Sequence, residues 1–419
     1  MKRREFLYKT SATVTAGLTV PELYARVHRN MEKAPTSTSF DVIVIGVGSM
    51  GASACYHLAR RGYRVLGLEQ YDIPHELGSH GGQSRIIRKA YGEATGYVPL
   101  LERAYENWKT LESETGAQVY FETGLTYFGP PGSAFLQTVR ESAETYNIPL
   151  NELSPEACRE KYPQFALPED YQRLEEPEAG LLTPERSILL MAEQALLRGA
   201  VIRSGEPVLG WEHTTGGVVV RTPRETYRAG KLVVTAGAWA RELLPALAPQ
   251  LHVTRQALAW VQPAAWDRFA LGTFPCWLLE HEGRDFYGFP ILPAGAFGGP
   301  LGLKLAQHYP GEAVADPTAA DRSPRKAEEE ALVNFLKQFL PQGYTQTLAM
   351  KTCLYTNTPD GHFVVDPLPG YGKDVVVAAG FSGHGFKFAS AIGEVLADLA
   401  MEGATDLPID LLRADRFGG

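Results

Sequence analysis

A run of small residues between a short apolar segment and a helix-like segment carries the first chemistry in this chain. The apolar run 42–45 is rich in β-branched residues, which is typical of a strand buried on both faces. Gly46, Gly48 and Gly51 follow it at G-x-G-x-x-G spacing. The first glycine permits a tight turn, the second lets the backbone approach a pyrophosphate, and the third allows close contact between strand and helix. The helix N-terminus then offers free N–H groups and a positive dipole end to phosphates.

An acidic residue stands where a ribose-binding group is expected. A second strand is predicted over 64–68, and Glu69 ends it about twenty residues after the glycine turn. A carboxylate at this place can accept the ribose hydroxyls and disfavours a 2′-phosphate. A glycine triplet alone is typical of a flexible loop, but strand, turn, helix and acid together predict a site for FAD or NAD.

The segment 78–88 combines glycines with two arginines. Arg85 and Arg88 are three residues apart, so both guanidinium groups can lie on one side of the loop. Such a loop can wrap a phosphate or a flavin ring. The alternative is a solvated loop whose arginines pair with surface acids, and the residues alone leave both interpretations open.

The segment 351–355 has the alternation of a strand. This alternation places Lys351, Cys353 and Tyr355 on one face. A nearby cation stabilises the thiolate, which is the form of cysteine that attacks a carbon electrophile. An inert cysteine in an apolar core is the alternative.

The patterns around these residues predict an α/β architecture at both ends of the chain and a more β-rich middle. Helices are expected over 97–115, 133–146, 155–161, 186–197, 326–339 and 389–401. Strands are expected over 121–128, 201–202, 218–221, 231–234 and 375–379. Between 251 and 305 short strands broken by Pro and Gly predict an antiparallel sheet, with strands over 257–262, 276–280 and 286–289.

The fold class predicted from these elements is α/β plus β, with two domains. The first is a discontinuous Rossmann-type FAD-binding domain, expected over 39–125, 178–250 and 346–419. The second is an antiparallel-sheet substrate domain, expected over 126–177 and 251–345.

Composition limits the classes of function. The chain has 419 residues, of which 44% are hydrophobic and 21% charged, as in ordinary globular proteins. Its formal net charge of −8 gives no support for nucleic-acid binding. No apolar run reaches the ~20 residues that span a bilayer, so no stable membrane insertion is expected. The four cysteines are scattered and form no C-x-x-C pair, so neither a disulfide framework nor a metal site is expected.

The first 38 residues are expected to be a leader and a linker. Arg3 and Arg4 precede Phe6-Leu7 and a modestly apolar run over 10–20. This pattern is similar to the twin-arginine signal, which exports folded, cofactor-loaded proteins to the periplasm. The alternative is a basic disordered tail on a cytoplasmic protein.

Several stretches together resemble the monomeric sarcosine oxidase / N-methyltryptophan oxidase family of flavoprotein amine oxidases. They lie in order between about 41 and 402, and comprise the Gly46 turn, 84–88 with 90–93, 286–290, 302–304 with His308, 351–356 and 380–387. The last two motifs are much more specific than the glycine fingerprint. The segment 291–300 is longer than this resemblance leads us to expect, so the identity of the substrate stays open.

The resemblance implies a role for each polar residue. Cys353 would be bonded to the 8α carbon of the flavin, which makes the FAD covalent. Arg88 and Lys387 would hold the substrate carboxylate. Arg85 would lie against the flavin, and Lys304 would lie near flavin N5 and promote the reaction with oxygen. Pocket residues would position the amine, namely Tyr287, His308 and Tyr355. The implied cofactor contacts are Gly46, Gly48, Ser49, Met50, Gly51, Glu69, Ser84, Arg85, Val208, Cys353, Gly383, His384, Gly385 and Lys387.

The resemblance also implies a reaction in two halves. A hydride equivalent passes from the carbon beside the amine nitrogen to FAD, and water hydrolyses the resulting imine. Dioxygen then reoxidises the cofactor and yields hydrogen peroxide. The expected substrates are secondary amines such as sarcosine, other N-methyl amino acids, or cyclic amino acids such as pipecolate.

Two other functions stay open at this point. One is an FAD-dependent dehydrogenase of similar substrates that passes electrons to a quinone or carrier. The other is a flavin-binding protein without amine turnover, which would need none of Arg88, Lys304 and Lys387. The family implies a monomer, although the sequence leaves the oligomeric state open.

Overall fold

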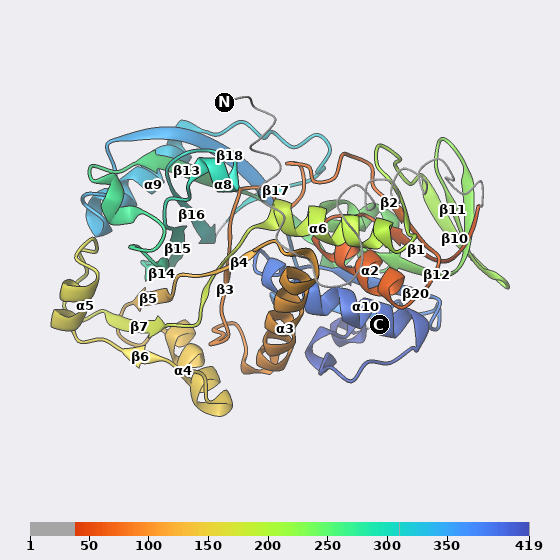
Figure 1. Ribbon diagram of the computed structural model, residues 1–419, viewed down its shortest axis with the longest axis horizontal. Coiled ribbons are helices and arrows are strands. Elements are labelled where there is room, and N and C mark those ends of the chain that lie inside the picture. The colour runs from red at the N-terminus through yellow and green to blue at the C-terminus, as the bar shows by residue number, and fades with distance from the viewer. Residues whose placement is uncertain (1–37, 310, 419) are drawn as a thin grey trace, which may run out of the picture.

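The protein contains two large sheets of different character, which lie at opposite ends of the molecule (Figure 1). The computed structural model describes residues 38–309 and 311–418, so the predicted leader lies outside the described residues apart from Thr38. Between the two large sheets runs a small three-stranded sheet of β3 (Arg85–Ile87), β8 (Gly180–Leu182) and β4 (Tyr120–Glu122).

The first large sheet has eight strands and is built around parallel pairs. Its strands in spatial order are β10 (Gly210–Thr214), β11 (Gly217–Arg221), β12 (Thr226–Val234), β1 (Ser39–Ile45), β2 (Val65–Leu68) and β9 (Val201–Arg203), with β20 (Val375–Ala379) beside β12 and β19 (Val364–Pro367) beside β20. β1 runs parallel to both β12 and β2, and β12 runs parallel to β20. The β1–β2 neighbourhood is therefore the centre of a Rossmann-type layer.

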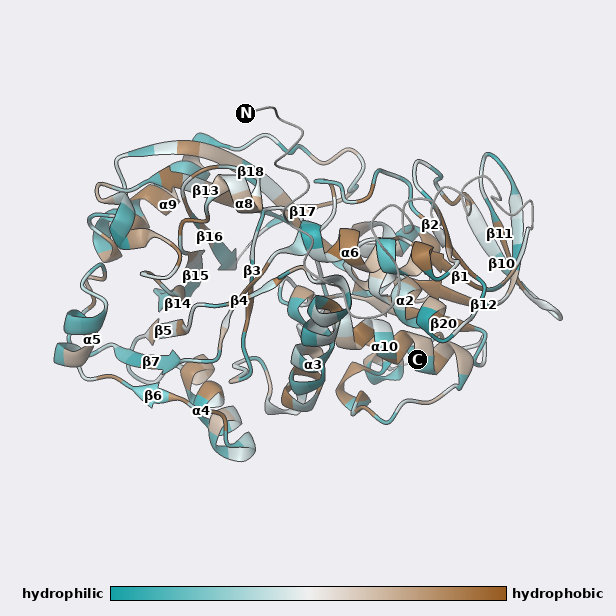
Figure 2. Cartoon of the chain, in the orientation of Figure 1, coloured by the Kyte–Doolittle hydropathy of each residue, from teal (hydrophilic) through white to brown (hydrophobic). Residues whose placement is uncertain are grey.

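Helices cover one side of this sheet. α2 (Ser49–Arg60) packs between α6 (Pro184–Leu197) and α10 (Ala389–Met401), and α3 (Val98–Thr115) packs on α10. The apolar side chains of β1 are buried, and in Figure 2 the ribbon around β1 and β12 is brown, whereas the exposed helix α5 (Pro155–Lys161) is largely teal. Burial of continuous apolar strands between layers is the expected behaviour of a parallel sheet.

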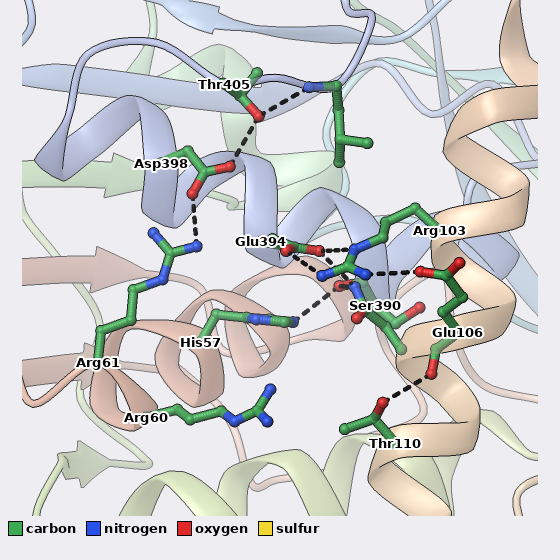
Figure 3. A network of polar contacts seen from close by, with 12 residues as sticks. His57, Arg60, Arg61, Arg103, Glu106, Thr110, Ser390, Glu394, Asp398 and Thr405 are labelled. Carbon is green, nitrogen blue, oxygen red and sulfur yellow. Dashed lines mark hydrogen bonds and ion pairs between the residues drawn. The ribbon is translucent and has the colours of Figure 1, made fainter.

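A polar network ties α2, α3 and α10 together (Figure 3). The guanidinium of Arg103 donates two hydrogen bonds to Glu394, each of 2.7 Å. Arg61 pairs with Asp398 at 2.5 Å. Because α10 follows directly after the 380–387 motif, this network also fixes the position of that motif against the rest of the layer.

The second large sheet has nine strands. In spatial order they are β17 (Glu312–Val314), β13 (His252–Gln262), β16 (Leu303–Tyr309), β15 (Arg284–Phe289), β14 (Cys276–His281), β5 (Leu125–Gly129), β7 (Gln172–Glu176) and β6 (Asn151–Glu152), with β18 (Gln346–Asn357) also paired to β13. Its pairs are antiparallel except β14 with β5. One face packs on α9 (Lys326–Phe339), where Phe335 stacks on both Trp277 and Phe286. Helix α4 (Ala134–Tyr146) and the one-turn helices α7 (Ala240–Leu243) and α8 (Ala294–Phe297) complete the described helices of the α type.

The predicted fold class is confirmed, and one predicted strand is wrong. The strand expected over 121–128 is two strands, β4 and β5, which belong to different sheets. The chain turns between them at Gly124, whose φ of +70° disfavours other residues. β18, which we grouped with the cofactor domain, pairs with β13 of the second sheet, and the domain boundaries stay a prediction. Over the described residues, no helix is both long and apolar enough to cross a membrane.

Candidate active site

The glycine turn after β1 has the geometry that a pyrophosphate site requires. Gly46 has a φ of +85°, and a Cβ on it would lie 2.6 Å from the carbonyl oxygen of Thr235. A Cβ on Gly51 would lie 1.8 Å from the carbonyl oxygen of Gly46. Only glycine fits either position, because the Cβ of any other residue would overlap with these backbone atoms. α2 begins at Ser49, so its first N–H groups point toward this turn.

The acid at the end of β2 is held beside the same turn. Glu69 is buried and accepts hydrogen bonds from the backbone N–H groups of Val47 (2.9 Å) and Tyr71 (3.1 Å). Burial raises the pKa of Glu69, although these hydrogen bonds oppose the shift. A carboxylate fixed in this way faces the cavity that the turn opens into, as a ribose-binding acid must.

One elongated cavity joins the glycine turn to the C-terminal motifs. It is lined by residues from both ends of the chain, among them Gly46, Gly48, Ser49, Met50, Glu69, Arg85, Val208, Tyr355, Gly383 and Gly385. His80 also lines it, and its Nε2 is buried without a hydrogen-bond partner among the described residues. The glycine turn that can bind a pyrophosphate, the carboxylate of Glu69 that can bind a ribose, and the unpaired Nε2 of His80 all fit a bound FAD.

A second cavity adjoins the first. Most of the predicted catalytic residues line it, namely Arg85, Arg88, Tyr287, His308 and Lys387. Gly383, His384 and Phe386 line it as well. Arg85, Gly383 and Phe386 line both cavities, so the two spaces meet at this point. The structure therefore brings the predicted phosphate-binding turn and most of the predicted catalytic residues onto two adjoining cavities, whereas Lys304 and Cys353 are not among the residues that line either of them.

Arg88 is a buried cation with an unused donor. Its side chain is 4% exposed, and its Nη2 contacts both carboxylate oxygens of Glu93 at 2.6 Å. Its Nη1 has no partner in the described part of the chain. Burial opposes the charge on Glu93, but Arg88 and weaker neighbouring cations bring the pKa of Glu93 down to about 2. Arg88 therefore keeps its charge and has a donor left for another anion.

Lys387 lies across the same cavity at the start of the C-terminal helix segment. It is buried, and its Nζ donates to the carbonyl oxygen of His384 at 2.7 Å. Burial, followed by the charge of Arg88, lowers the pKa of Lys387 to about 7. Arg88 and Lys387 therefore place two cationic groups on one cavity, and of the two only Arg88 pairs with an acid, Glu93, among the described residues.

Lys304 is buried more deeply and is fully hydrogen-bonded. It lies on β16 at 2% exposure, and its Nζ is 4.4 Å from the ring centroid of Phe289. It donates to the carbonyl oxygens of Gly82 (2.5 Å) and Ser84 (2.8 Å) and to the hydroxyl of Ser84 (3.1 Å). Burial lowers its pKa well below the usual value, and Arg85 adds to the effect.

Cys353 is buried on β18 within reach of several positive charges. Burial raises the pKa of its thiol, and the charges of Arg85, Lys304 and Arg322 oppose that increase. The prediction that Lys351 supplies the positive charge beside Cys353 is wrong, because the Nζ of Lys351 pairs with the exposed carboxylate of Glu76. Strand alternation gave Lys351 the correct face but could not show that its long side chain reaches outward.

The remaining predicted residues are held by neutral contacts. Tyr355 and His308 contact each other through the hydroxyl and Nδ1 at 3.2 Å, and burial lowers the pKa of His308 to about 3. Arg85 donates to backbone carbonyl oxygens of its own loop, those of Ser79, Gly81 and Ser84. The ring of His384 contacts the hydroxyl of Tyr91 (2.5 Å) and the carbonyl oxygen of Gly361 (3.0 Å). The interpretation of segment 78–88 as a solvated loop whose arginines pair with surface acids therefore describes neither Arg85 nor Arg88.

Sequence reasoning missed a buried acid that holds the Arg88 segment. Glu176 is fully buried and accepts hydrogen bonds from the hydroxyl of Tyr127 (2.5 Å) and the backbone N–H groups of Lys89 (2.6 Å) and Ala90 (3.3 Å). Burial raises its pKa. A glutamate in a strand gives no local signal for this role, because its partners lie far away in the sequence.

Comparison with known proteins identifies the family. A family model described as FAD dependent oxidoreductase matches residues 41–399. The chain belongs to the FAD dependent oxidoreductase family. Within it, the chain is 39% identical over 387 residues to the monomeric sarcosine oxidase of Streptomyces avermitilis, covering 91% of this chain and 98% of that protein. It is 38% identical to the N-methyl-L-tryptophan oxidase of Yersinia pestis, covering 90% of this chain and 99% of that protein.

Solved structures agree with this assignment to the FAD dependent oxidoreductase family. NikD, an unusual amino acid oxidase essential for nikkomycin biosynthesis, is similar with a TM-score of 0.78 at 26% identity, over 90% of this chain and 98% of that chain. The L-proline dehydrogenase from P. horikoshii shares the fold, with a TM-score of 0.77 at 24% identity, over 90% of this chain and 97% of that chain. The predicted resemblance and the prediction of an FAD-dependent oxidoreductase are confirmed.

Proposed function

We propose that this protein oxidises secondary amines of the amino-acid type, in particular N-methyl or cyclic amino acids, with dioxygen as the electron acceptor. The observation that carries the proposal is the pair Arg88 and Lys387, which face one buried cavity next to the cavity that fits FAD. The relatives named monomeric sarcosine oxidase and N-methyl-L-tryptophan oxidase support this choice of substrate class.

Arg88 and Lys387 would bind the substrate carboxylate. The unpaired Nη1 of Arg88 and the N–H groups of Lys387 that do not contact His384 are the donors available to it. A planar guanidinium combined with a compact ammonium suits an anion that must be both oriented and neutralised. The carboxylate would give Lys387 an acidic partner, which it does not have among the described residues, and would share Arg88 with Glu93.

The neutral groups around the cavity would hold the amine. When bound, FAD takes up a hydride equivalent from the carbon beside the amine nitrogen and passes the electrons on to dioxygen. His308 is neutral at physiological pH because burial lowers its pKa, so it can accept or donate a hydrogen bond without repelling the amine. The hydroxyl groups of Tyr287 and Tyr355 would complete the contacts, since burial raises the pKa of each and keeps both protonated.

Lys304 would act through its fixed charge, not through contact with the substrate. Burial lowers the pKa of Lys304, but the three acceptors around its Nζ favour the charged ammonium, which would stabilise the negative charge that develops on dioxygen. We also propose that Cys353 bonds covalently to the flavin. The charges of Arg85, Lys304 and Arg322 support this role, because they favour the reactive thiolate.

Location and assembly are proposed from the sequence and the relatives' names alone. The arginine pair Arg3-Arg4 supports export by a twin-arginine-like signal. Three of the relatives are named monomeric sarcosine oxidase, and this supports a monomer.

A screen of amines with a peroxide readout tests the proposed function. We would incubate the purified holoenzyme with sarcosine, α-N-methyl amino acids and pipecolate, and follow both flavin bleaching and hydrogen peroxide. Bleaching with stoichiometric peroxide is expected for at least one of these amines. Bleaching without peroxide would favour a dehydrogenase that uses another acceptor, and the absence of bleaching with every amine would contradict amine oxidation altogether.

A further inference from the structure

We propose that the end of the second cavity formed by Glu280 and Asp285 binds a cationic side chain of the substrate. This inference rests on the proposed function, and it narrows the substrate to an N-alkyl or cyclic amino acid with a basic side chain. The carboxylate would lie at Arg88 and Lys387, and the positive group at Glu280 and Asp285, which line the same cavity.

The two acids lie on the active-site face of the second sheet. Glu280 on β14 is directly opposite Asp285 on β15, and Leu278 is directly opposite Tyr287 in the same ladder. Residues opposite each other, or two apart along a strand, share a face, so these four side chains lie together. Asp285 is therefore only about 7 Å along the strand from Tyr287, which is the distance of two residues.

The cavity connects these acids to the carboxylate-binding cations. Its lining includes Glu280 and Asp285 as well as Arg88 and Lys387, with apolar walls from Leu278, Phe135 and Phe286. The unpaired, buried Nη1 of Arg88 favours an anionic group of the ligand beside it. A ligand complementary to this lining would carry a negative group for Arg88, apolar groups for the walls and a positive group for the two acids.

Neither acid forms an ion pair with a cation in the described part of the chain. The hydroxyl of Ser133 donates to Glu280 Oε2 at 2.5 Å and fixes that carboxylate in place. Asp285 forms no side-chain hydrogen bond or ion pair within 38–309 and 311–418. Like charges directly opposite on a ladder are unfavourable, and a bound cation would relieve the repulsion.

The electrostatics of Asp285 are those of a carboxylate that a neighbouring positive charge would stabilise. Burial, followed by the charges of Glu280 and Glu93, raises the pKa of Asp285 to about 6, while Arg88 opposes the increase. The other ionisable groups on this cavity are Arg85, Tyr287, Lys387, His308 and His384, and burial raises the pKa of Tyr287 so that it stays neutral. Burial lowers the pKa of both histidines to about 4 or below, so neither supplies a positive charge near neutral pH.

The test compares two substrates that differ only in the charge of the side chain. α-N-Methyl-L-lysine and α-N-methyl-L-norleucine have the same reacting amine, so the ratio of their kcat/KM values measures recognition of the terminal ammonium. We expect the wild type to favour the lysine derivative by about tenfold or more, as one close ion pair would provide. Asp285→Asn, which keeps the size, should remove most of this preference and leave kcat/KM for the norleucine derivative nearly unchanged.

A charge control and the pH dependence make the result specific. Glu282 belongs to the same hairpin but is 81% exposed and does not line the cavity, so Glu282→Gln should keep the preference. The preference should also fall as the pH drops below about 6, because Asp285 becomes protonated there. Equal kcat/KM values for the two substrates, or a preference that survives Asp285→Asn, would overturn the inference while the proposed amine oxidation stands. If neither these substrates nor any amine of the wider screen is oxidised, the proposed function itself fails.

Discussion

The charge state of Lys387 leads to a prediction about how carboxylate binding depends on pH. Burial and the charge of Arg88 lower the pKa of Lys387 to about 7, so the lysine is charged below pH 7 and progressively neutral above it. If its ammonium binds the substrate carboxylate, affinity for a carboxylate is fully present below pH 7 and falls above it. One proton is linked to binding, so the loss is about tenfold per pH unit.

A ligand without an amine isolates this effect. Methoxyacetate has the shape of sarcosine but an ether oxygen in place of the nitrogen, and its carboxylate stays ionised throughout. We would titrate it into the holoenzyme between pH 6 and 9 and follow the flavin absorption spectrum. The dissociation constant should be constant below about pH 7 and rise by about 100-fold between pH 7 and 9. If Arg88 alone still binds the carboxylate when Lys387 is neutral, the rise levels off at a smaller value.

Among the acids and histidines of this cavity with a shifted pKa, Asp285 is the one that titrates near this interval, at about pH 6, so the change in affinity above pH 7 reports on Lys387. Burial lowers the pKa of His308 to about 3 and that of His384 to about 4, and the pKa of Glu93 is about 2. Lys387→Met should therefore bind methoxyacetate weakly at pH 6 and show little further change up to pH 9. A wild-type affinity that does not change with pH, or a pH dependence that persists in Lys387→Met, would refute the assignment of Lys387 to the carboxylate.

Three further predictions concern the cofactor and oxygen. Gly51→Ala should purify largely without FAD, because its Cβ would lie 1.8 Å from the carbonyl oxygen of Gly46. The FAD content is measured by the ratio of absorbance at the flavin and protein bands, and a normal content would contradict the role of this turn in binding the pyrophosphate. Acid-precipitated wild type should keep its yellow colour in the pellet, whereas Cys353→Ser should release it to the supernatant; a colourless wild-type pellet would exclude a covalent flavin. Lys304→Met should keep the rate of flavin reduction but slow reoxidation by oxygen by about 100-fold or more in stopped-flow measurements, and an unchanged reoxidation rate would contradict the role of its charge.

The glycine turn could be predicted from the sequence because its determinants are local. The positive φ of Gly46 and the closeness of Gly51 to the preceding strand follow from contacts within a few residues, and such contacts leave a clear pattern of residue types. Glu69 follows from the same unit, since a strand–turn–helix–strand module has a nearly constant length. These positions were therefore predicted with their reasons.

The gathering of the catalytic residues could not be predicted from spacing. Lys304 contacts Ser84, which is 220 residues earlier, and nothing in either segment indicates that contact. Only the resemblance to a family brought these residues together before the structure was known. The wrong role for Lys351 has the same cause, because its partner Glu76 lies 275 residues away.

The acidic end of the second cavity did have a signal in the sequence. Glu282 and Gly283 both have positive φ and form a two-residue turn between His281 and Arg284, which are paired in the ladder. A Glu-Gly pair between two alternating strands is therefore a hairpin pattern, and it sets the register on both sides. Counting outward from that turn would have placed Glu280 opposite Asp285 without a structure.

The contacts of the two buried lysines explain why they cannot exchange roles. A lysine ammonium has three donors, and Lys304 uses all three on Gly82 and Ser84. Lys387 uses one of its three on His384. A carboxylate that approached Lys304 would have to displace existing hydrogen bonds in a buried place, whereas at Lys387 it would satisfy donors that are otherwise unpaired. The number of donors left over therefore supports the proposal that Lys387 and Arg88 bind the substrate carboxylate, while Lys304 acts through its charge.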